Sequence, residues 1–186
     1  MKNIFKFLLG IFFLFSMLNC GGGSSDDDVD QKYYFKAKLN GTEIDFLHSA
    51  KLQGGGNDNR FEHITLSGYD KKLPNSSNLN DVPPAFGIEI WNMGGNIGSG
   101  TYSQAGNPTD NNTPASYSLS GEYHPTPFIQ YDAKVTQDFV FTITELSKTD
   151  GIKGTFKGKL ISSQEPGKVI EVTEGELYLP YDVMVP

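Results

Sequence analysis

The sequence predicts an all-β fold, an antiparallel β-sandwich of about 9–10 strands, with a flattened up-and-down β-barrel as the alternative. Apolar and polar residues alternate along most of the chain, which is the pattern of strands with one buried face. Glycine, asparagine and proline separate the alternating segments, and these residues favour turns. Beyond the N-terminal apolar segment, no window of ten or more residues has the periodicity of an amphipathic helix. Many short strands joined by turns are typical of sandwiches and barrels.

The first expected strands form a hairpin around Asn40-Gly41. This dipeptide favours the type I′ turn that joins two antiparallel strands. Phe35, Ala37 and Leu39 alternate with polar residues before the turn, and residues 42–46 continue the alternation after it. The same pattern predicts three further strands, at Ile64 and Leu66, at Phe86, Ile88 and Ile90, and at Tyr117 and Leu119.

The clearest hairpin is expected near the C-terminal end, where residues 147–151 reverse the chain. Another strand begins at Ile170 and Val172, and after Glu174-Gly175 residues 176–179 close the sheet. The side chains expected to point inward from this hairpin are those of Phe139, Phe141, Ile143, Ile152, Phe156 and Leu160. The outward side chains of its second strand predict a solvated face: Lys153, Thr155, Lys157 and Lys159.

Residues 1–19 have the composition of a secretory signal peptide that ends at a cysteine. Lys2 and Lys6 precede an apolar run that is shorter than the roughly 20 residues of a transmembrane helix. Cys20 is the only cysteine, so it cannot form an internal disulfide. The segment resembles the type II signal of bacterial lipoproteins, which implies that Cys20 is lipidated and anchors the protein to a membrane. Ordinary secretion with a free thiol is the alternative.

Residues 20–31 are expected to be a flexible tether, because glycine, serine and aspartate cannot bury apolar surface. Their Ser-Ser-Asp-Asp-Asp run resembles the acidic export signals of Bacteroidota surface lipoproteins, which implies an outer-membrane anchor facing the cell surface. The remaining residues 32–186 suit a single all-β domain.

The charge of the mature chain excludes some partners. Loss of residues 1–19 lowers the 15 basic residues to 13 against 22 acidic residues, which gives a net charge of −9. Nucleic acid and anionic lipid would be repelled, so membrane contact is expected through the lipid anchor alone.

Three segments of the domain carry a resemblance to a known group. They are residues 35–41 (Phe-x-Ala-x-Leu-Asn-Gly), residues 152–156 (Ile-Lys-Gly-Thr-Phe) and residues 173–177 (Thr-Glu-Gly-Glu-Leu). Together with the lipidation signal, they resemble uncharacterised single-domain, all-β surface lipoproteins of Bacteroidota. The resemblance implies location and architecture and carries no active site across.

Residue spacing gives no catalytic or metal centre, so the sequence predicts a protein that is not an enzyme and has no metal or cofactor. His48, His63 and His124 lack the spacing that places two nitrogens on one ion. Asn57, Asp58 and Asn59 offer oxygen atoms for calcium but do not form an EF-hand loop. No G-x-S-x-G elbow is present, and the glycines of residues 94–100 are expected to form a loop that leads into a short strand. A carboxylate pair among Glu89, Glu122 and Glu145 would require the fold to bring two of them together.

Aromatic side chains are the best candidates for binding. Trp91 is out of phase with Ile88 and Ile90, so it either faces outward as a platform or packs against a second sheet. Tyr117 and Tyr123 lie in a later strand and are further ligand-binding candidates. The polar loops 70–84 and 103–114 are long enough to border a binding surface.

The leading hypothesis is a lipid-anchored envelope protein whose β-domain binds an extracellular glycan, a peptide or an envelope protein without catalysis. A structural envelope component without a small ligand is the first alternative. An extracellular hydrolase and a carrier of a lipophilic ligand are the others.

Overall fold

The computed structural model describes residues 32–56, 60–92, 94–103, 117–133 and 139–185. The chain divides into two units, and the second, Lys32–Pro186, holds all of these residues. The expected signal peptide, Cys20, the tether, residues 57–59 and most of the loop 103–114 therefore lie outside the described residues. Within the described part of the chain, no helical segment has both the length and the apolar composition of a membrane span.

The described residues form eleven strands and one short 3-10 helix, so the predicted all-β fold is confirmed. The elements are β1 (Tyr34–Leu39), β2 (Thr42–Asp45), β3 (His48–Gly55), β4 (His63–Tyr69), η2 (Leu79–Asp81), β5 (Ala85–Trp91), β6 (Gly100–Ser103), β7 (Ser118–Thr126), β8 (Ile129–Asp132), β9 (Val140–Ser147), β10 (Gly151–Ser162) and β11 (Val169–Leu179).

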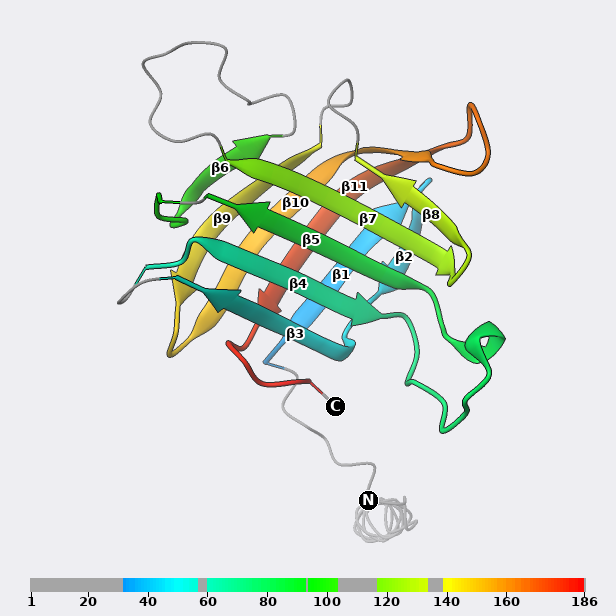
Figure 1. The fold of residues 1–186 in the computed structure, drawn as a ribbon, viewed down its shortest axis with the longest axis horizontal. Helices are drawn as coiled ribbons and strands as arrows, with labels where there is room; N and C mark the ends of the chain where they lie inside the picture. Colours follow the sequence, from blue (N-terminus) through cyan, green and yellow to red (C-terminus); the bar gives the residue numbers. More distant parts are fainter. Residues whose placement is uncertain (1–31, 57–59, 93, 104–116, 134–138, 186) are drawn as a thin grey trace, which may run out of the picture. The chain divides into compact units, whose positions relative to one another are not determined.

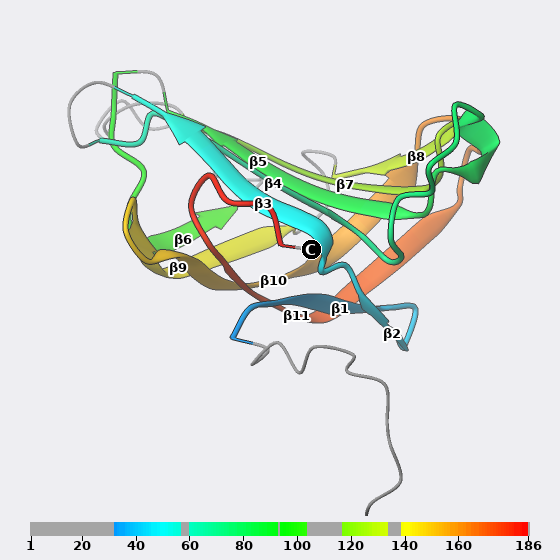
Figure 2. The same cartoon turned by 90° about the horizontal axis from the view of Figure 1, so that it is seen from below.

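The strands form one antiparallel sheet that curls into a half-barrel with two layers. The front layer consists of β3, β4, β5, β7 and β8, and the back layer of β6, β9, β10, β11, β1 and β2 (Figures 1 and 2). The long strand β10 joins them, because it pairs with β9 along its first part and with β8 at Ile161 and Ser162. The sheet thus combines the two packed layers of a sandwich with the largely consecutive strand order of a barrel.

One turn has the form that the sequence predicts, and one expected turn is a bulge instead. Asn40 and Gly41 have φ angles of 50° and 82°, as the predicted type I′ turn between β1 and β2 requires. Glu174 and Gly175 do not separate two strands as expected, because β11 runs continuously from Val169 to Leu179. They form a bulge instead, with Glu174 at a φ of 50° and a shift in the register between β11 and β10.

Two strands, β3 and β8, carry too weak a pattern to be predicted. Only Ala50 and Leu52 of β3 are buried, and the strand ends in glycine. Its outer edge is covered by the segment that follows β11: Asp182 donates its N–H to the carbonyl oxygen of Leu52 at 2.8 Å, and Val185 donates to Ala50 at 2.8 Å. Backbone pairing with neighbours, more than side-chain alternation, therefore defines this strand.

The core lies between the two layers and is rich in phenylalanine. Phe35 of β1 has ring centroids of three other phenylalanines within 6.0 Å, from both layers and from the loop after β2. The largest fully buried aromatic side chains are Phe35, Phe46, Phe86, Phe139 and Phe141. Because this cluster joins the layers, it fixes the relative positions of the strands and the direction of their outward side chains.

Candidate functional site

A shallow groove crosses the outward face of the front layer. Its volume is about 210 Å³, and it lies over β4, β5 and β7. The floor is low because the outward residues in its middle are small: Ser67, Ala85, Gly87 and Ser120. Longer side chains surround them, so the hollow results from the alternation that places glycine and serine opposite the buried isoleucines.

Cross-strand register brings polar side chains together along this groove. Glu89 of β5 lies between Thr65 of β4 and Ser120 of β7, and Glu122 lies beside Gly87 in the next row. Glu89 and Glu122 are therefore diagonal neighbours on adjacent strands, with Cβ atoms about 7–8 Å apart. Both line the groove, and their side chains are 38% and 42% exposed.

Each carboxylate has an imidazole beside it. The Nε2 atom of His63 lies 3.0 Å from Oε1 of Glu89 and 2.9 Å from the Thr65 hydroxyl. The Nε2 atom of His124 lies 3.3 Å from Oε2 of Glu122. A proton on Nε2 makes each imidazole a donor to its carboxylate. The groove therefore offers carboxylate and hydroxyl acceptors together with imidazole and hydroxyl donors.

Trp91 is an outward aromatic side chain next to the groove and is not itself among the residues that line it. Its side chain is 40% exposed, and it lies two positions along β5 from Glu89. The His63 ring stacks on one face of the indole, with centroids 3.7 Å apart and planes inclined by 19°. On the other neighbouring strand, β7, the residue paired with Trp91 is Ser118, which is short and exposed. Trp91 therefore presents a flat apolar surface next to polar groups.

The other two predicted binding residues lie elsewhere. Tyr117 packs edge-on against Tyr102, and its hydroxyl accepts a hydrogen bond from the Ser103 N–H at 3.0 Å. Tyr123 is only 8% exposed and points into the core, where burial and then the charge of Asp70 raise the pKa of its phenol. Of the two positions that the sequence left open for Trp91, the structure has the outward one, whereas Tyr123 points inward.

The remaining candidates do not join this groove. His48 is exposed at the start of β3, and Glu145 of β9 pairs with Lys153 on the back layer. Among the described residues, no group of three histidine, cysteine, aspartate or glutamate side chains is placed to hold a metal ion. Residues 94–99 form a loop that leads into β6, as expected.

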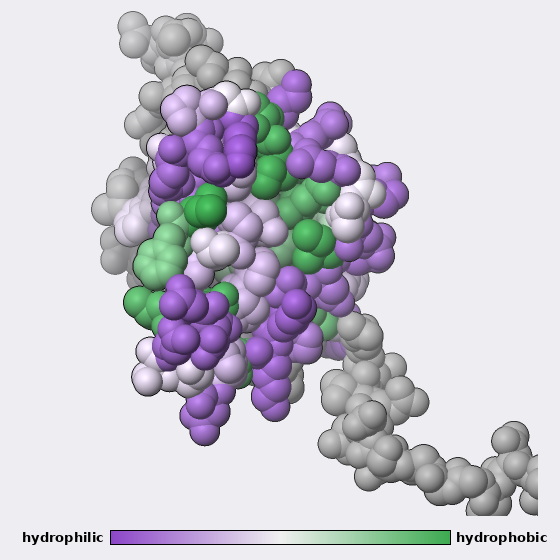
Figure 3. Space-filling view, turned by 90° about the vertical axis from the view of Figure 1, so that its right-hand side faces the viewer, coloured by the Kyte–Doolittle hydropathy of each residue, from purple (hydrophilic) through white to green (hydrophobic). Residues whose placement is uncertain are grey.

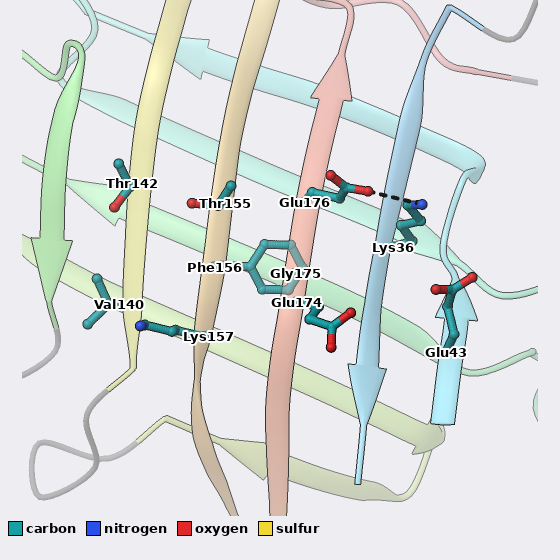
Figure 4. Close-up of a pocket in the computed structure, with 10 residues that line it drawn as sticks. All are labelled: Lys36, Glu43, Val140, Thr142, Thr155, Phe156, Lys157, Glu174, Gly175 and Glu176. Carbon is teal, nitrogen blue, oxygen red and sulfur yellow. Dashed lines mark ion pairs between the residues drawn. The ribbon is translucent and has the colours of Figure 1, made fainter. Parts of the chain in front are cut away.

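A larger groove of about 470 Å³ lies on the outward face of the back layer (Figure 4). Lysines and glutamates line it, and they neutralise one another. Lys36 lies 3.0 Å from Glu176, and Lys38, next to the groove, lies 2.6 Å from Glu174. Its one aromatic residue, Phe156, is 2% exposed. This surface corresponds to the solvated face that the lysines of β10 predict. It is a weaker candidate for ligand binding than the front groove, because its charged side chains pair with one another.

One end of the domain carries separate exposed apolar side chains among hydrophilic ones (Figure 3). Leu79 of η2 and Phe128, in the turn between β7 and β8, are each 61% exposed. Single apolar side chains of this kind are common on protein surfaces.

The fold and the front groove define an all-β domain with a shallow outward groove next to an exposed tryptophan. Comparison of the chain with protein-family models, curated proteins and solved structures gives no match. The functional argument therefore depends on the geometry of the groove and on the sequence.

Proposed function

We propose that this protein is a lipid-anchored surface protein of the cell envelope that binds a glycan in the front groove without catalysis. The observation that supports this proposal is the exposed indole of Trp91, which lies beside the carboxylate, hydroxyl and imidazole groups of the groove. Sugar rings have one apolar face of C–H groups and a rim of hydroxyls. An aromatic plane next to hydrogen-bonding side chains is complementary to both.

The groove supports binding better than hydrolysis, although it holds two carboxylates. A glycosidase requires a general acid that stays protonated, and a desolvated environment produces that state. Glu89 and Glu122 are both open to solvent and lie next to histidines. This environment suits carboxylates that accept hydrogen bonds from a ligand.

Replacement of Trp91 by alanine is expected to weaken glycan binding by about tenfold or more, since loss of an aromatic contact costs at least about 1.4 kcal/mol. A thermal-shift screen of the purified protein against glycans identifies the ligand, and isothermal titration calorimetry then compares the variants. Phe128→Ala is the control, because it removes an aromatic side chain outside the groove that is more exposed than Trp91. Equal affinity of the Trp91→Ala variant and the unmodified protein would contradict the proposal.

The membrane anchor has a separate test. When the chain is expressed in a bacterium with a lipoprotein pathway, we expect a radiolabelled fatty acid to be incorporated and the protein to fractionate with membranes. The Cys20→Ser variant should lose both properties, because multiple acyl chains supply the membrane affinity. A Cys20→Ser protein that stays labelled and membrane-bound would rule out this anchor.

A further inference from the structure

Acidic side chains lie along the front groove. Glu89 and Glu122 line it, and Asp132 of β8 lies directly opposite Glu122 in the register. His63 contacts Glu89, and His124 contacts Glu122. No lysine or arginine is among the described residues that line the groove. Among the described residues, Lys51 of β3 pairs with Ser67 at the margin of the groove.

This arrangement differs from that of the back layer, where neighbouring lysines pair with the glutamates. Lys36 and Lys38 each lie within 3.0 Å of a glutamate there. On the front layer, the described residues that line the groove include Glu89 and Glu122 and no lysine or arginine.

The polar contacts of Glu122 and Asp132 hold them in place. Glu122 contacts Nε2 of His124, and Asp132 accepts hydrogen bonds from Gln130 and Ser163. Carboxylate oxygens have several acceptor positions, so Glu122 and Glu89 can accept further bonds from the groove side. A ligand that places a cationic donor near the floor, over Gly87 and Ser120, would lie between these two glutamates.

We infer that the groove selects glycans with a free, protonated amino group, as in de-N-acetylated hexosamines, over N-acetylated or uronic-acid glycans. The inference depends on the proposed glycan-binding function and names its ligand class. An ammonium group makes charge-assisted hydrogen bonds to carboxylates, which are about twice as strong as neutral ones. A uronate would be repelled by the same carboxylates and by the net charge of the chain, which is −7 before any processing. The indole of Trp91 favours a sugar over a cationic peptide, because it offers a plane for the ring.

The experiment compares matched oligosaccharides by calorimetry at about 0.15 M salt, where charges separated by more than about 8 Å are screened. The probes are glucosamine tetramers of several linkages, their N-acetylated forms and a galacturonate tetramer. We expect the amine form to bind about tenfold tighter than the N-acetylated form, and the galacturonate to give no measurable binding. Glu122→Gln should reduce the preference for the amine to less than about threefold. The control Glu171→Gln makes the same charge change at an exposed position of β11. It should leave the preference for the amine unchanged.

The outcomes separate this inference from the proposed function. Equal binding of amine, N-acetyl and uronate forms that still requires Trp91 overturns the inference and leaves glycan binding in place. Equal loss of preference in Glu122→Gln and Glu171→Gln also overturns it, because the overall charge would then explain the selectivity. No binding of any oligosaccharide overturns both. An octamer of lysine that binds as tightly as the glucosamine tetramer, with no effect of Trp91→Ala, replaces the glycan with a cationic peptide.

Discussion

Replacing Phe35 by alanine is expected to lower the free energy of unfolding by about 3–5 kcal/mol, the usual cost of removing a buried phenylalanine. Phe35 is fully buried, and its ring lies 5.9 Å from Phe46, 6.0 Å from Phe86 and 5.8 Å from Phe156. The cavity would form where the front and back layers meet, so neighbouring side chains on both layers would lose contacts. Stabilities of small domains are about 5–15 kcal/mol, and the loss is a large part of that range.

Urea unfolding followed by circular dichroism measures this effect as a lower midpoint with an unchanged slope. Phe128→Ala removes the same atoms from a side chain that is 61% exposed, and it should change the free energy of unfolding by less than about 0.5 kcal/mol. Similar losses in the two variants would mean that the cluster around Phe35 does not hold the layers together.

Gly68→Ala is expected to destabilise the domain by at least about 3 kcal/mol, at the upper end of what overpacking costs. A Cβ atom at Gly68 would lie 2.0 Å from the carbonyl oxygen of Phe46, which is a backbone atom. The backbone at Phe46 cannot easily retreat, because its N–H donates a hydrogen bond to the carbonyl oxygen of Phe35 at 2.6 Å. The loop after β2 and strand β4 would therefore have to separate.

Gly87→Ala provides the matched comparison. The nearest atom to a Cβ atom at Gly87 is the carbonyl oxygen of Leu66 at 3.5 Å, which is an ordinary contact. Alanine also restricts the unfolded chain, so the change should be near zero or slightly stabilising. Thermal unfolding of both variants tests the pair, and a Gly68→Ala midpoint equal to that of Gly87→Ala would exclude the close approach of Phe46.

Side-chain alternation was sufficient to predict most of the strands and their inward faces. Phe35, Ile88 and Phe141 are buried at the expected phases. The order of the strands could not be predicted in the same way, because alternation does not say which strands pair. β6 lies between β5 and β7 in the sequence but pairs with β9 on the other layer, and this leaves β5 and β7 adjacent.

The candidate site could be predicted only in part for the same reason. Trp91 faces outward as its phase suggested, whereas the groove depends on the adjacency of β4, β5 and β7. That adjacency brings Glu89 and Glu122 together. Tyr123 is in phase with the buried Leu119, so strict alternation along β7 already indicates an inward side chain.

The first strand of the domain pairs with the last, since β1 lies beside β11 in the sheet (Figure 1). β1 therefore pairs with a strand that is synthesised only after all the other described strands. Contacts between such distant segments slow folding, because the loop that joins them must close first. The sheet cannot be completed while residues near 179 are still in the ribosome.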